Sequence, residues 1–394
     1  MNKIVHVMIA NFYKNGFGYQ ENILPAKHKE LGYDVEIITY NQGGDASYKG
    51  SDKEPLTYIN PDGIPVHILE KNKSILRRIP YLNVTINKTK GLYEKLSEIK
   101  PDIIFVHNIS ASDNLDVVKY KRNNPFVRIY ADNHCDYYNA PINSFKKKFC
   151  RKVLMGRIGR ALGKESEMIW GVTPWRVKYQ EEVYGIKPEK SSLLVMGGDE
   201  NKIDWDNRTS IRTSIRTQLS IPEDAFVLIT GGKIDKAKNI HLLVEALKTL
   251  NKDNLFLIVF GRFENDMCDF ESQINEVKNI KYIGWINADQ AYNYFLTSDL
   301  AVFPGTHSVL WEQACAAGLP ALFKDWDGGF SHVDVGGNCI LLKDISIDGI
   351  KEELNKLYEN QTLLMEMQAI ASTKARKFFS YIEIAKRSIG ITAD

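Results

Sequence analysis

The sequence has little of what marks a disulfide-stabilised, zinc-binding or membrane-spanning protein. Its five cysteines include no C-x-x-C pair, which favours reduced thiols in a cytoplasm over a disulfide framework or a zinc site. No apolar run approaches the roughly 20 residues needed to cross a bilayer, and we expect no signal peptide before the first strand. The net charge is only +2, so overall charge gives no reason to expect a nucleic-acid partner.

What is present is a regular alternation of apolar strand-like runs and amphipathic helices over 394 residues. This alternation predicts an α/β fold with two doubly wound domains. The expected strands are 3–10, 35–39, 66–69, 102–107, 126–131 and 168–173, then 226–230, 255–260, 280–283, 300–303 and 321–323. The polar run 200–218 is expected to cross between the domains.

The stretch 298–323 reads as strand, loop, helix, turn and strand. We expect a helix at 309–317 that Ser308 or Thr306 caps and Gly318 ends. A helix that begins just after a buried strand presents free N–H groups to an anion. Glu312, in the first turn, could then reach the hydroxyls of a ribose. The alternative is a capped α/β crossover with a solvated glutamate. The candidate binding residues are His307, Ser308, Val309 and Glu312.

A second stretch carries two glycines and two lysines after a strand. Gly231 and Gly232 follow the run 226–230 and allow the backbone to approach a ligand closely. Lys233 and Lys238 could supply positive charge to a diphosphate. Lysines beside a turn are also commonly solvated, which is the alternative here.

Together the two stretches resemble the donor domain of GT-B glycosyltransferases, particularly glycosyltransferase family 4. In that family a basic residue follows the glycine turn and a lysine comes five positions later, as Lys233 and Lys238 do here. Paired glutamates eight positions apart precede a helix ending in Ala-x-Gly-x-Pro. Glu312 matches the second glutamate and 316–320 match the tail, but Pro304 replaces the first glutamate. That residue helps hold the donor sugar in the family, so the sugar is not implied.

The resemblance implies two Rossmann-like domains with an interdomain cleft. Residues 1–199 would form the acceptor side and 200–371 the donor side, with a C-terminal helix at about 372–394 packing back on the first domain. The implied reaction moves a sugar from a nucleotide-diphosphate sugar to a hydroxyl acceptor, with retention of configuration and without a metal or other cofactor. We expect a UDP-sugar rather than a GDP-sugar, and a role in bacterial cell-surface polysaccharide or lipid-linked glycan synthesis.

The resemblance also extends to glycine turns and a base-binding segment. Gly16 and Gly18, after the first strand, would face the diphosphate and acceptor. Gly261 follows the second strand of the second domain, and Trp285 and Ile286 lie where the family reads the nucleotide base. A buried aromatic is the alternative for Trp285. Gly16-Phe17-Gly18 also suggests a dinucleotide fingerprint, but Glu21 replaces its third glycine, which argues against a nicotinamide cofactor.

The segment D-N-H-C-D at 132–136 is the chemical candidate of the first half. The family often carries a histidine and an aspartate here, which His134 and Asp136 match, and an imidazole suits a hydrogen bond to a sugar hydroxyl. A structural loop and a metal site remain alternatives. His107, at the end of the preceding strand, is expected to face the cleft. With Lys238 and Glu312, His134 and Asp136 make up the catalytic candidates.

A basic segment at 145–164 suggests a membrane surface. It holds eight basic residues among 146–164 and no acidic one. Phe145, Phe149 and Val153 share one helical face, whereas Leu154, Ile158 and Leu162 share another. Such a helix suits an anionic lipid surface, and the alternative is a solvated helix with inward apolar residues. We therefore expect a cytoplasmic protein, peripheral on the inner face of the cell membrane.

Two rival functions use the same fold. A sugar-nucleotide epimerase would need a nucleotide sugar but no acceptor. A non-catalytic nucleotide-sugar-binding protein would fit the missing first glutamate.

Overall fold

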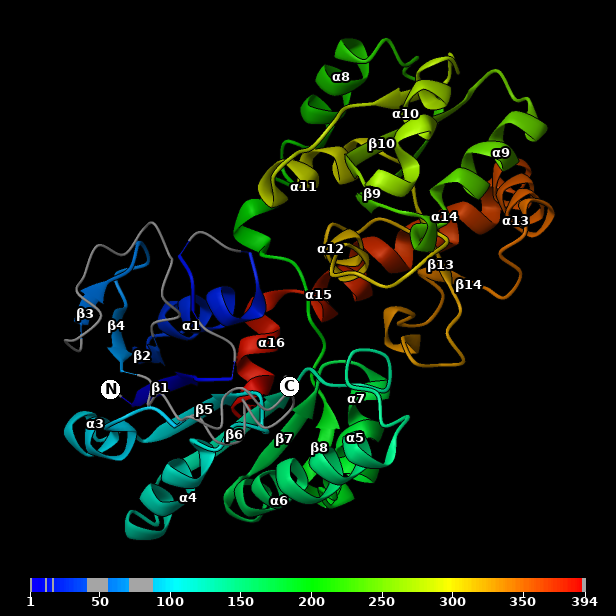
Figure 1. Ribbon diagram of the computed structural model, residues 1–394. Helices are drawn as coiled ribbons and strands as arrows, with labels where there is room; N and C mark the ends of the chain where they lie inside the picture. Colours follow the sequence, from blue (N-terminus) through cyan, green and yellow to red (C-terminus); the bar gives the residue numbers. More distant parts are fainter. Residues whose placement is uncertain (1, 11–12, 16–17, 41–55, 71–87, 392–394) are drawn as a thin grey trace. The chain divides into compact units, whose positions relative to one another are not determined.

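The computed structural model describes residues 2–10, 13–15, 18–40, 56–70 and 88–391. The predicted site residue Gly16 lies outside these ranges. The chain forms two compact units, residues 1–195 with 384–394 and residues 196–383 (Figure 1). The expected domain boundary was 199/200, with a return helix from about 372.

The return to the first unit comes later than expected. Residues 371–378, which form η9 (Ala371–Ala375) and α15 (Arg376–Phe378), stay in the second unit. Ala371, Ala375 and Phe379 are fully buried there, and Phe379 O accepts a hydrogen bond from Gly198 N. Only the last part of α16 (Tyr381–Ser388) joins the first unit.

The first unit is built on a sheet of eight strands. Their order is β3-β4-β2-β1-β5-β6-β7-β8, and all pairs are parallel except β3 with β4. The strands are β1 (Lys3–Met8), β2 (Asp34–Tyr40), β3 (Leu56–Ile59), β4 (Pro65–Leu69), β5 (Ile103–His107), β6 (Arg128–Asn133), β7 (Met168–Gly171) and β8 (Ser191–Leu193). The helices used below are α1 (Gln20–Glu30), α3 (Leu92–Ile99), α4 (Asn114–Asn123), α5 (Phe145–Phe149), η2 (Cys150–Met155), α6 (Gly156–Glu165) and α7 (Pro174–Tyr179).

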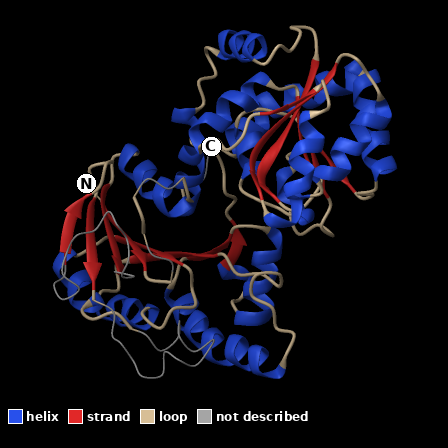
Figure 2. Cartoon of the chain, turned by 45° about the horizontal axis from the view of Figure 1, so that its top comes forward, coloured by secondary structure: helices blue, strands red, loops and turns tan. Residues whose placement is uncertain are grey.

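The second unit is built on a sheet of six strands, all parallel (Figure 2). Their order is β11-β10-β9-β12-β13-β14. The strands are β9 (Phe226–Ile234), β10 (Leu255–Phe263), β11 (Ile280–Tyr282), β12 (Leu300–Phe303), β13 (Ala321–Lys324) and β14 (Cys339–Leu342). The main helices are α8 (Arg208–Gln218), α9 (Ile240–Leu250), α10 (Cys268–Asn275), α11 (Ala288–Thr297), α12 (Leu310–Ala316), α13 (Ile347–Glu359) and α14 (Gln361–Ile370).

The apolar runs explain why these strands form. Residues of β9, β10 and β12 are almost all buried, as expected for parallel strands covered on both faces. The strand order of the second sheet reverses between β9 and β12, which lie side by side. In open parallel sheets, ligands bind outside the carboxyl ends of the strands at such a point. The loops after β9 and β12 are therefore the place to look for a site.

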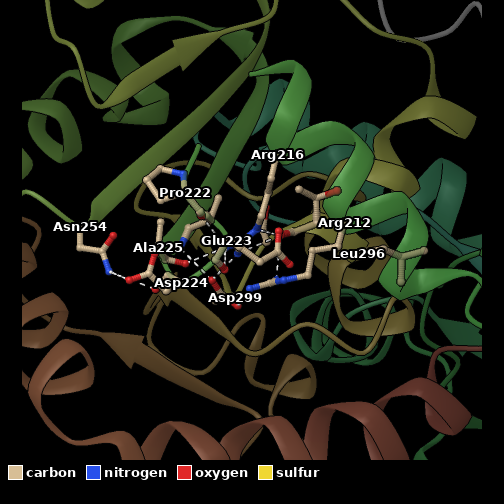
Figure 3. Close-up of polar contacts among 12 residues, drawn as sticks. Arg212, Arg216, Pro222, Glu223, Asp224, Ala225, Asn254, Leu296 and Asp299 are labelled. Carbon is tan, nitrogen blue, oxygen red and sulfur yellow. Dashed lines mark hydrogen bonds and ion pairs between the residues drawn. The ribbon is translucent and has the colours of Figure 1, made fainter. Parts of the chain in front are cut away.

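The expectation that 200–218 is an interdomain crossing is wrong for most of that run. Residues 208–218 form α8, which packs against α11 in the second unit. The cause is a buried arginine. Arg216 is fully buried, and Figure 3 shows its guanidinium among backbone carbonyls beside Asp299. It donates to Glu223 O at 2.7 Å, to Ala225 O at 2.9 Å and to Asp299 Oδ2 at 2.9 Å.

Asp299 ties α8 to the sheet. Its carboxylate also accepts from Arg212 Nη2 at 2.8 Å and from Val227 N of β9 at 2.8 Å. Replacing Asp299 with alanine should lower the free energy of unfolding by about 3 kcal/mol, because it leaves a buried guanidinium without its counter-charge and the N–H of Val227 without its acceptor. Urea denaturation measures this.

The matched control is Asp348→Ala, which removes an exposed carboxylate paired with Lys351 in the same unit. It should change stability by less than about 0.5 kcal/mol. Equal effects of the two substitutions would contradict the anchoring role of Asp299.

Candidate functional site

The loops after β9 and β12 touch each other through backbone and side-chain hydrogen bonds. Lys238, in the 3-10 turn η6 (Lys236–Lys238), donates from Nζ to Thr306 O at 2.6 Å. Thr306 N donates to Ala237 O at 3.0 Å. Asn239 Nδ2 donates to Pro304 O at 3.0 Å. The two stretches that the sequence analysis singled out, one with Lys233 and Lys238 and one with the start of α12, are therefore in contact.

Gly305 allows this close approach. A Cβ atom at position 305 would lie 2.3 Å from both C and Cα of Lys238 and 2.4 Å from Ala237 O. Any larger residue would push the two loops apart. Because the ammonium of Lys238 reaches the next residue's carbonyl, Gly305 also fixes where that charge sits.

Lys238 is a half-buried cation with no carboxylate in ion-pair contact among the described residues. Burial lowers the pKa of Lys238 to about 8, and the nearby charge of Asp235 offsets this only in part. Asp235 itself accepts from Lys238 N and so caps the turn rather than pairing with the ammonium. A cation held out of water without a counter-ion favours the binding of an anion.

Lys233 differs from Lys238 in exposure. Its side chain is 61% exposed and lies 3.6 Å from Glu264 Oε2. The two lysines predicted together are thus unequal, because a solvated amine already near a carboxylate gains less from an anion than a buried one.

Helix α12 begins at Leu310, and its N-cap is Val309 without a side-chain cap. The expectation that Ser308 or Thr306 caps this helix is wrong. Ser308 Oγ is instead buried and makes no hydrogen bond within the described structure. Its free hydroxyl, next to the helix start and in the loop that holds Lys238, remains available to a ligand oxygen.

Glu312 lies in the first turn of α12, as expected, but it is fully buried. Its Oε1 accepts from His307 Nε2 at 2.8 Å and from His332 Nε2 at 2.9 Å. Burial opposes its ionisation, but the two histidines outweigh burial and lower the pKa of Glu312. Oε2 has no hydrogen-bond partner in the described structure. A solvated glutamate, the alternative considered above, is excluded.

These three side chains also form a possible metal-ligand set. One ligand atom from each of His307, Glu312 and His332 lies within 4.8 Å of the others. His307 also stacks on Phe330, with ring centroids 4.2 Å apart. Because both Nε2 atoms already lie at hydrogen-bond distance from Oε1, two N–H donors satisfy that oxygen without an ion.

The other predicted donor-side residues line the adjacent strand ends. Gly232 and Gly261 are paired between β9 and β10, and a Cβ on Gly261 would lie 1.8 Å from Gly232 O. Gly261 N donates to Gly284 O at 2.8 Å. Trp285, which follows, is 72% exposed, so the buried aromatic considered as an alternative is excluded. Ile286 is half-buried.

The first unit places His134 against a buried carboxylate. His134 Nε2 lies 3.4 Å from Asp132 Oδ1, and the histidine side chain is 20% exposed. Burial lowers the pKa of His134, but the charge of Asp132 outweighs this and raises it. Gly18, the other predicted residue of this unit within the described ranges, is half-buried.

Asp136 holds a turn. Its Oδ1 accepts from Tyr138 N and Asn139 N, each at 2.9 Å, and its Oδ2 lies 3.2 Å from Arg176 Nε. These contacts engage both carboxylate oxygens within the protein. The structure therefore favours a structural role for Asp136. The side chain of His134, in contrast, is partly exposed to solvent.

Sequence reasoning missed the polar residues buried behind His134, of which Asp132 contacts it directly. His107 was expected to face a cleft, but it is 1% exposed and lies 3.1 Å from Asp132 Oδ2. The segment analysis also did not single out Asp132 or His6. The available signal was a polar residue inside an otherwise apolar run, which in a buried strand requires a partner.

The pKa of Lys238 gives a test of anion binding. A bound diphosphate should raise the pKa of Lys238 from about 8. Below that value the ammonium is already charged; above it, binding must take up a proton. The affinity for UDP should therefore fall with rising pH by up to about tenfold per pH unit above pH 8, as measured by titration calorimetry.

Lys238→Met is the matched variant, because it keeps the length of the side chain and removes the charge. It should bind UDP more weakly at neutral pH and show only the ligand's own pH dependence. The same pH dependence in both proteins would contradict the assignment.

Comparisons with known proteins show a similarity to glycosyltransferases. Residues 211–378 match the family model described as "Glycosyl transferases group 1". A lipopolysaccharide 1,2-N-acetylglucosaminetransferase of Salmonella typhimurium is 28% identical over 36% of this chain and 42% of its own length. An alpha-monoglucosyldiacylglycerol synthase of Acholeplasma laidlawii is 24% identical over 64% of this chain and 65% of its own length. The matches thus span less than two thirds of these relatives.

The structural comparison covers the whole chain. The structure of HepE from Anabaena in complex with UDP superposes with a TM-score of 0.67 at 15% identity, over 98% of each chain. A likeness at that identity concerns the fold. The expected GT-B fold is therefore confirmed, and residues 211–378 match the model of the glycosyl transferases group 1 family.

Proposed function

We propose that this protein transfers a sugar from a nucleotide-diphosphate sugar to a hydroxyl group of a glycan or lipid-linked acceptor. The bond between the sugar's anomeric carbon and the diphosphate oxygen breaks, a bond to the acceptor oxygen forms, and the acceptor loses its proton. The donor we propose is a UDP-sugar, in keeping with HepE, whose structure holds UDP. Retention of the anomeric configuration is part of the proposal.

One observation carries this proposal: the ammonium of Lys238 is partly removed from water, without a carboxylate partner, where the loops after β9 and β12 meet. The departing diphosphate gains negative charge as the sugar leaves, so a preorganised cation stabilises the transition state more than the ground state. The unpartnered hydroxyl of Ser308 and the start of α12 lie in the same loop. With these groups in place, we propose that no metal is required for leaving-group departure.

We propose that Glu312 and Trp285 contact the nucleoside. Oε2 of Glu312, buried and without a partner, would accept a hydrogen bond from a ribose hydroxyl. The two histidines on Oε1 keep this carboxylate ionised and fix its orientation. The exposed ring of Trp285 would stack on the base. Lys233, whose side chain is more exposed, would contribute less to binding of the diphosphate than Lys238.

In the first unit we propose that His134 contacts a hydroxyl of the transferred sugar. Its ring is partly exposed while Asp132 holds it from behind. An imidazole with one nitrogen beside a carboxylate can donate a hydrogen bond from its other nitrogen. Pro304, in place of the family's first glutamate, removes one carboxylate that would otherwise hold the sugar, so His134 would carry more of the sugar recognition.

The surface of α5 and η2 supports a membrane-bound acceptor. Phe145 is 86% exposed, Phe149 48% and Val153 46%, so the face that these residues share points to solvent. Ile158 and Leu162 are buried. Of the two apolar faces predicted for 145–164, one therefore packs inward and the other is exposed among basic residues. An exposed aromatic face of this kind suits the interface of an anionic bilayer.

No described helix is long and apolar enough to cross a membrane. We therefore propose peripheral binding at the inner face of the cell membrane through α5 and η2. The relative from Acholeplasma laidlawii is named as a synthase of a glycolipid, which supports a lipid acceptor. A role in bacterial cell-surface glycan synthesis is part of the same proposal.

Transfer should depend on Lys238. Lys238→Met should lower kcat/KM by about 100-fold, the scale expected when one donor to a developing anion is removed. Its melting temperature should stay near that of the wild type, because the substitution removes a desolvated charge. The assay incubates UDP-sugars with a hydroxyl acceptor and, separately, without one. Lys236→Met, an exposed lysine of the same turn, is the control and should retain activity.

Two outcomes would reject the proposed reaction. Wild-type activity of the Lys238→Met variant would show that Lys238 does not stabilise the departing diphosphate. An epimerised nucleotide sugar formed without acceptor, and no transfer with one, would identify an epimerase instead.

Membrane binding should depend on the exposed aromatic face. The double variant Phe145→Ser/Phe149→Ser should lose most binding to vesicles that contain phosphatidylglycerol, because it removes the apolar anchors. Replacing Lys146, Lys147, Lys148 and Arg151 with glutamine should also weaken binding, by about 1 kcal/mol per charge near the surface. Sedimentation with vesicles measures both.

Met365→Ser removes an exposed apolar side chain from the second unit and is the control. It should bind vesicles as the wild type does. Unchanged binding of both the aromatic and the basic variants would contradict the membrane proposal.

A further inference from the structure

The second unit contains a pocket that the proposed transfer site does not use. Its volume is about 260 Å³, which is below the roughly 300–1,000 Å³ of sites for drug-sized ligands, so it suits a small molecule. Its walls come from the first residues of the unit, the end of α12 and the segment 372–380. The polar residues that line it are Glu200, Ser372, Thr373, Arg376, Lys377 and Ser380.

The segments that form the pocket contact one another directly. Gly198 N donates to Phe379 O at 3.0 Å, and Tyr381 N donates to Gly198 O at 3.2 Å. Helix α12 packs against both η9 and α15, and Figure 1 shows α15 next to it. A Cβ atom on Gly198 would lie 2.6 Å from Ala316 Cβ. The pocket is therefore built within one compact unit, from segments distant in sequence.

Arg376 is a half-buried cation in the wall of this pocket. Its guanidinium carbon lies 4.2 Å from the centre of the Trp205 ring. Burial lowers the pKa of Arg376, and the charge of Asp206 offsets this only in part. In the part of the chain that the structure describes, the side chain of Arg376 has no hydrogen-bond or ion-pair partner. A partly desolvated cation of this kind gains from an anion.

Stacking on Trp205 leaves the hydrogen-bonding edge of Arg376 free. A guanidinium stacks through its flat face, whereas its five N–H groups point outward in the plane of the group. The indole thus orients the side chain without using any of its donors. An oriented guanidinium with free donors suits bidentate binding of a phosphate. Lys377, an exposed residue of the same wall, adds a second positive charge.

The hydroxyl groups of the wall have already used their protons. Ser372 Oγ and Thr373 Oγ1 both donate to Ala369 O, at 3.3 and 2.6 Å. Ser380 Oγ donates to Glu200 Oε2 at 2.9 Å. Each of these hydroxyl oxygens can still accept a hydrogen bond. This part of the pocket therefore suits a ligand that carries hydroxyl groups.

The charges that line the pocket are positive on balance. Arg376 and Lys377 are cations, and Glu200 is the carboxylate among the lining residues. The hydroxyl of Ser380 donates to that carboxylate. The pocket thus favours an anionic group near the two cations and neutral hydroxyl groups near Glu200.

We propose that this pocket binds a small phosphate monoester that carries hydroxyl groups, such as a sugar phosphate. Arg376 and Lys377 hold the phosphate, and the hydroxyl oxygens of the wall accept from the hydroxyl groups of the ligand. Lys238 and Glu312 of the proposed transfer site do not line the pocket, and the ligand is bound here without being converted. This inference does not rest on the proposed function.

Titration calorimetry of the full-length protein tests the proposal. The parent protein is the Lys238→Met variant, so that phosphate groups do not bind at the proposed donor site. The probes are glucose 6-phosphate, mannose 6-phosphate and glycerol 3-phosphate, and the comparisons are inorganic phosphate and glucose. At least one ester should bind about tenfold more tightly than inorganic phosphate, because it adds hydrogen bonds from its hydroxyl groups. Glucose should not bind measurably.

Two variants of the wall test the role of charge. Arg376→Met should weaken binding of the ester by at least about tenfold, the scale of one hydrogen bond to a charged group. Thr373→Glu keeps the contact of Arg376 with Trp205 and adds a carboxylate to the wall, so it should weaken binding at least as much. The matched control is Lys374→Met, an exposed lysine of η9 that does not line the pocket. It should bind as the parent does.

The outcomes decide the proposal even if Arg376→Met does not fold, because Thr373→Glu tests the same pocket. Failure of every ester to bind would overturn it, and so would equal binding by the parent and the wall variants. Inorganic phosphate that binds as tightly as the esters would overturn the recognition of hydroxyl groups. Because no nucleotide sugar is used, absence of transfer would reject the proposed function and leave this assignment intact.

Discussion

The half-buried ammonium of Lys238 is the feature on which the proposed site of the second unit depends. Lys238 lies in a turn that the loop after β12 covers, and its Nζ atom is held 2.6 Å from Thr306 O. Burial without a carboxylate partner makes this cation costly in the free protein and favourable once an anion arrives. The reversal of strand order between β9 and β12 places the loops after these strands beside each other. Gly305 allows the two loops to approach closely. The remaining proposed contacts with the nucleotide start from this point.

Both units keep a buried carboxylate ionised by placing two histidines beside it. In the second unit a carboxylate, Glu312, is kept ionised in the interior by His307 and His332. In the first unit Asp132 is kept ionised between His134 and His107. Each pair of histidines replaces the water that a buried carboxylate would lose. In each case one further group, Glu312 Oε2 or the exposed edge of His134, remains for a ligand.

The apolar periodicity predicted most of the fold. The run 300–303 is β12 to the residue, and 226–230 and 255–260 form the cores of β9 and β10. These strands are buried on both faces, so their hydrophobicity is a local signal. The short strand β14 (Cys339–Leu342), which follows Gly336 and Gly337, was missed. Helix α8 was also missed, because its stability comes from Asp299 and backbone carbonyls distant in sequence.

In the candidate site, too, local features were predictable and contacts between residues distant in sequence were not. The spacing of Lys233 and Lys238 and the position of Glu312 in a first helical turn were predictable, since both are local. The inequality of the two lysines was not, because it depends on the loop after β12 covering only one of them. The burial of Glu312 depends on His332, 20 positions further along the chain. The contacts of His6 with His107 and His28 likewise join β1, β5 and α1, which no local pattern reveals.

The most direct measurement is a crystal structure of the protein with UDP. The account predicts that the β-phosphate lies within hydrogen-bond distance of Lys238 Nζ and Ser308 Oγ, with the ribose at Glu312 Oε2. A nucleotide bound elsewhere, or one that leaves the ammonium of Lys238 on Thr306 O without a phosphate contact, would contradict it.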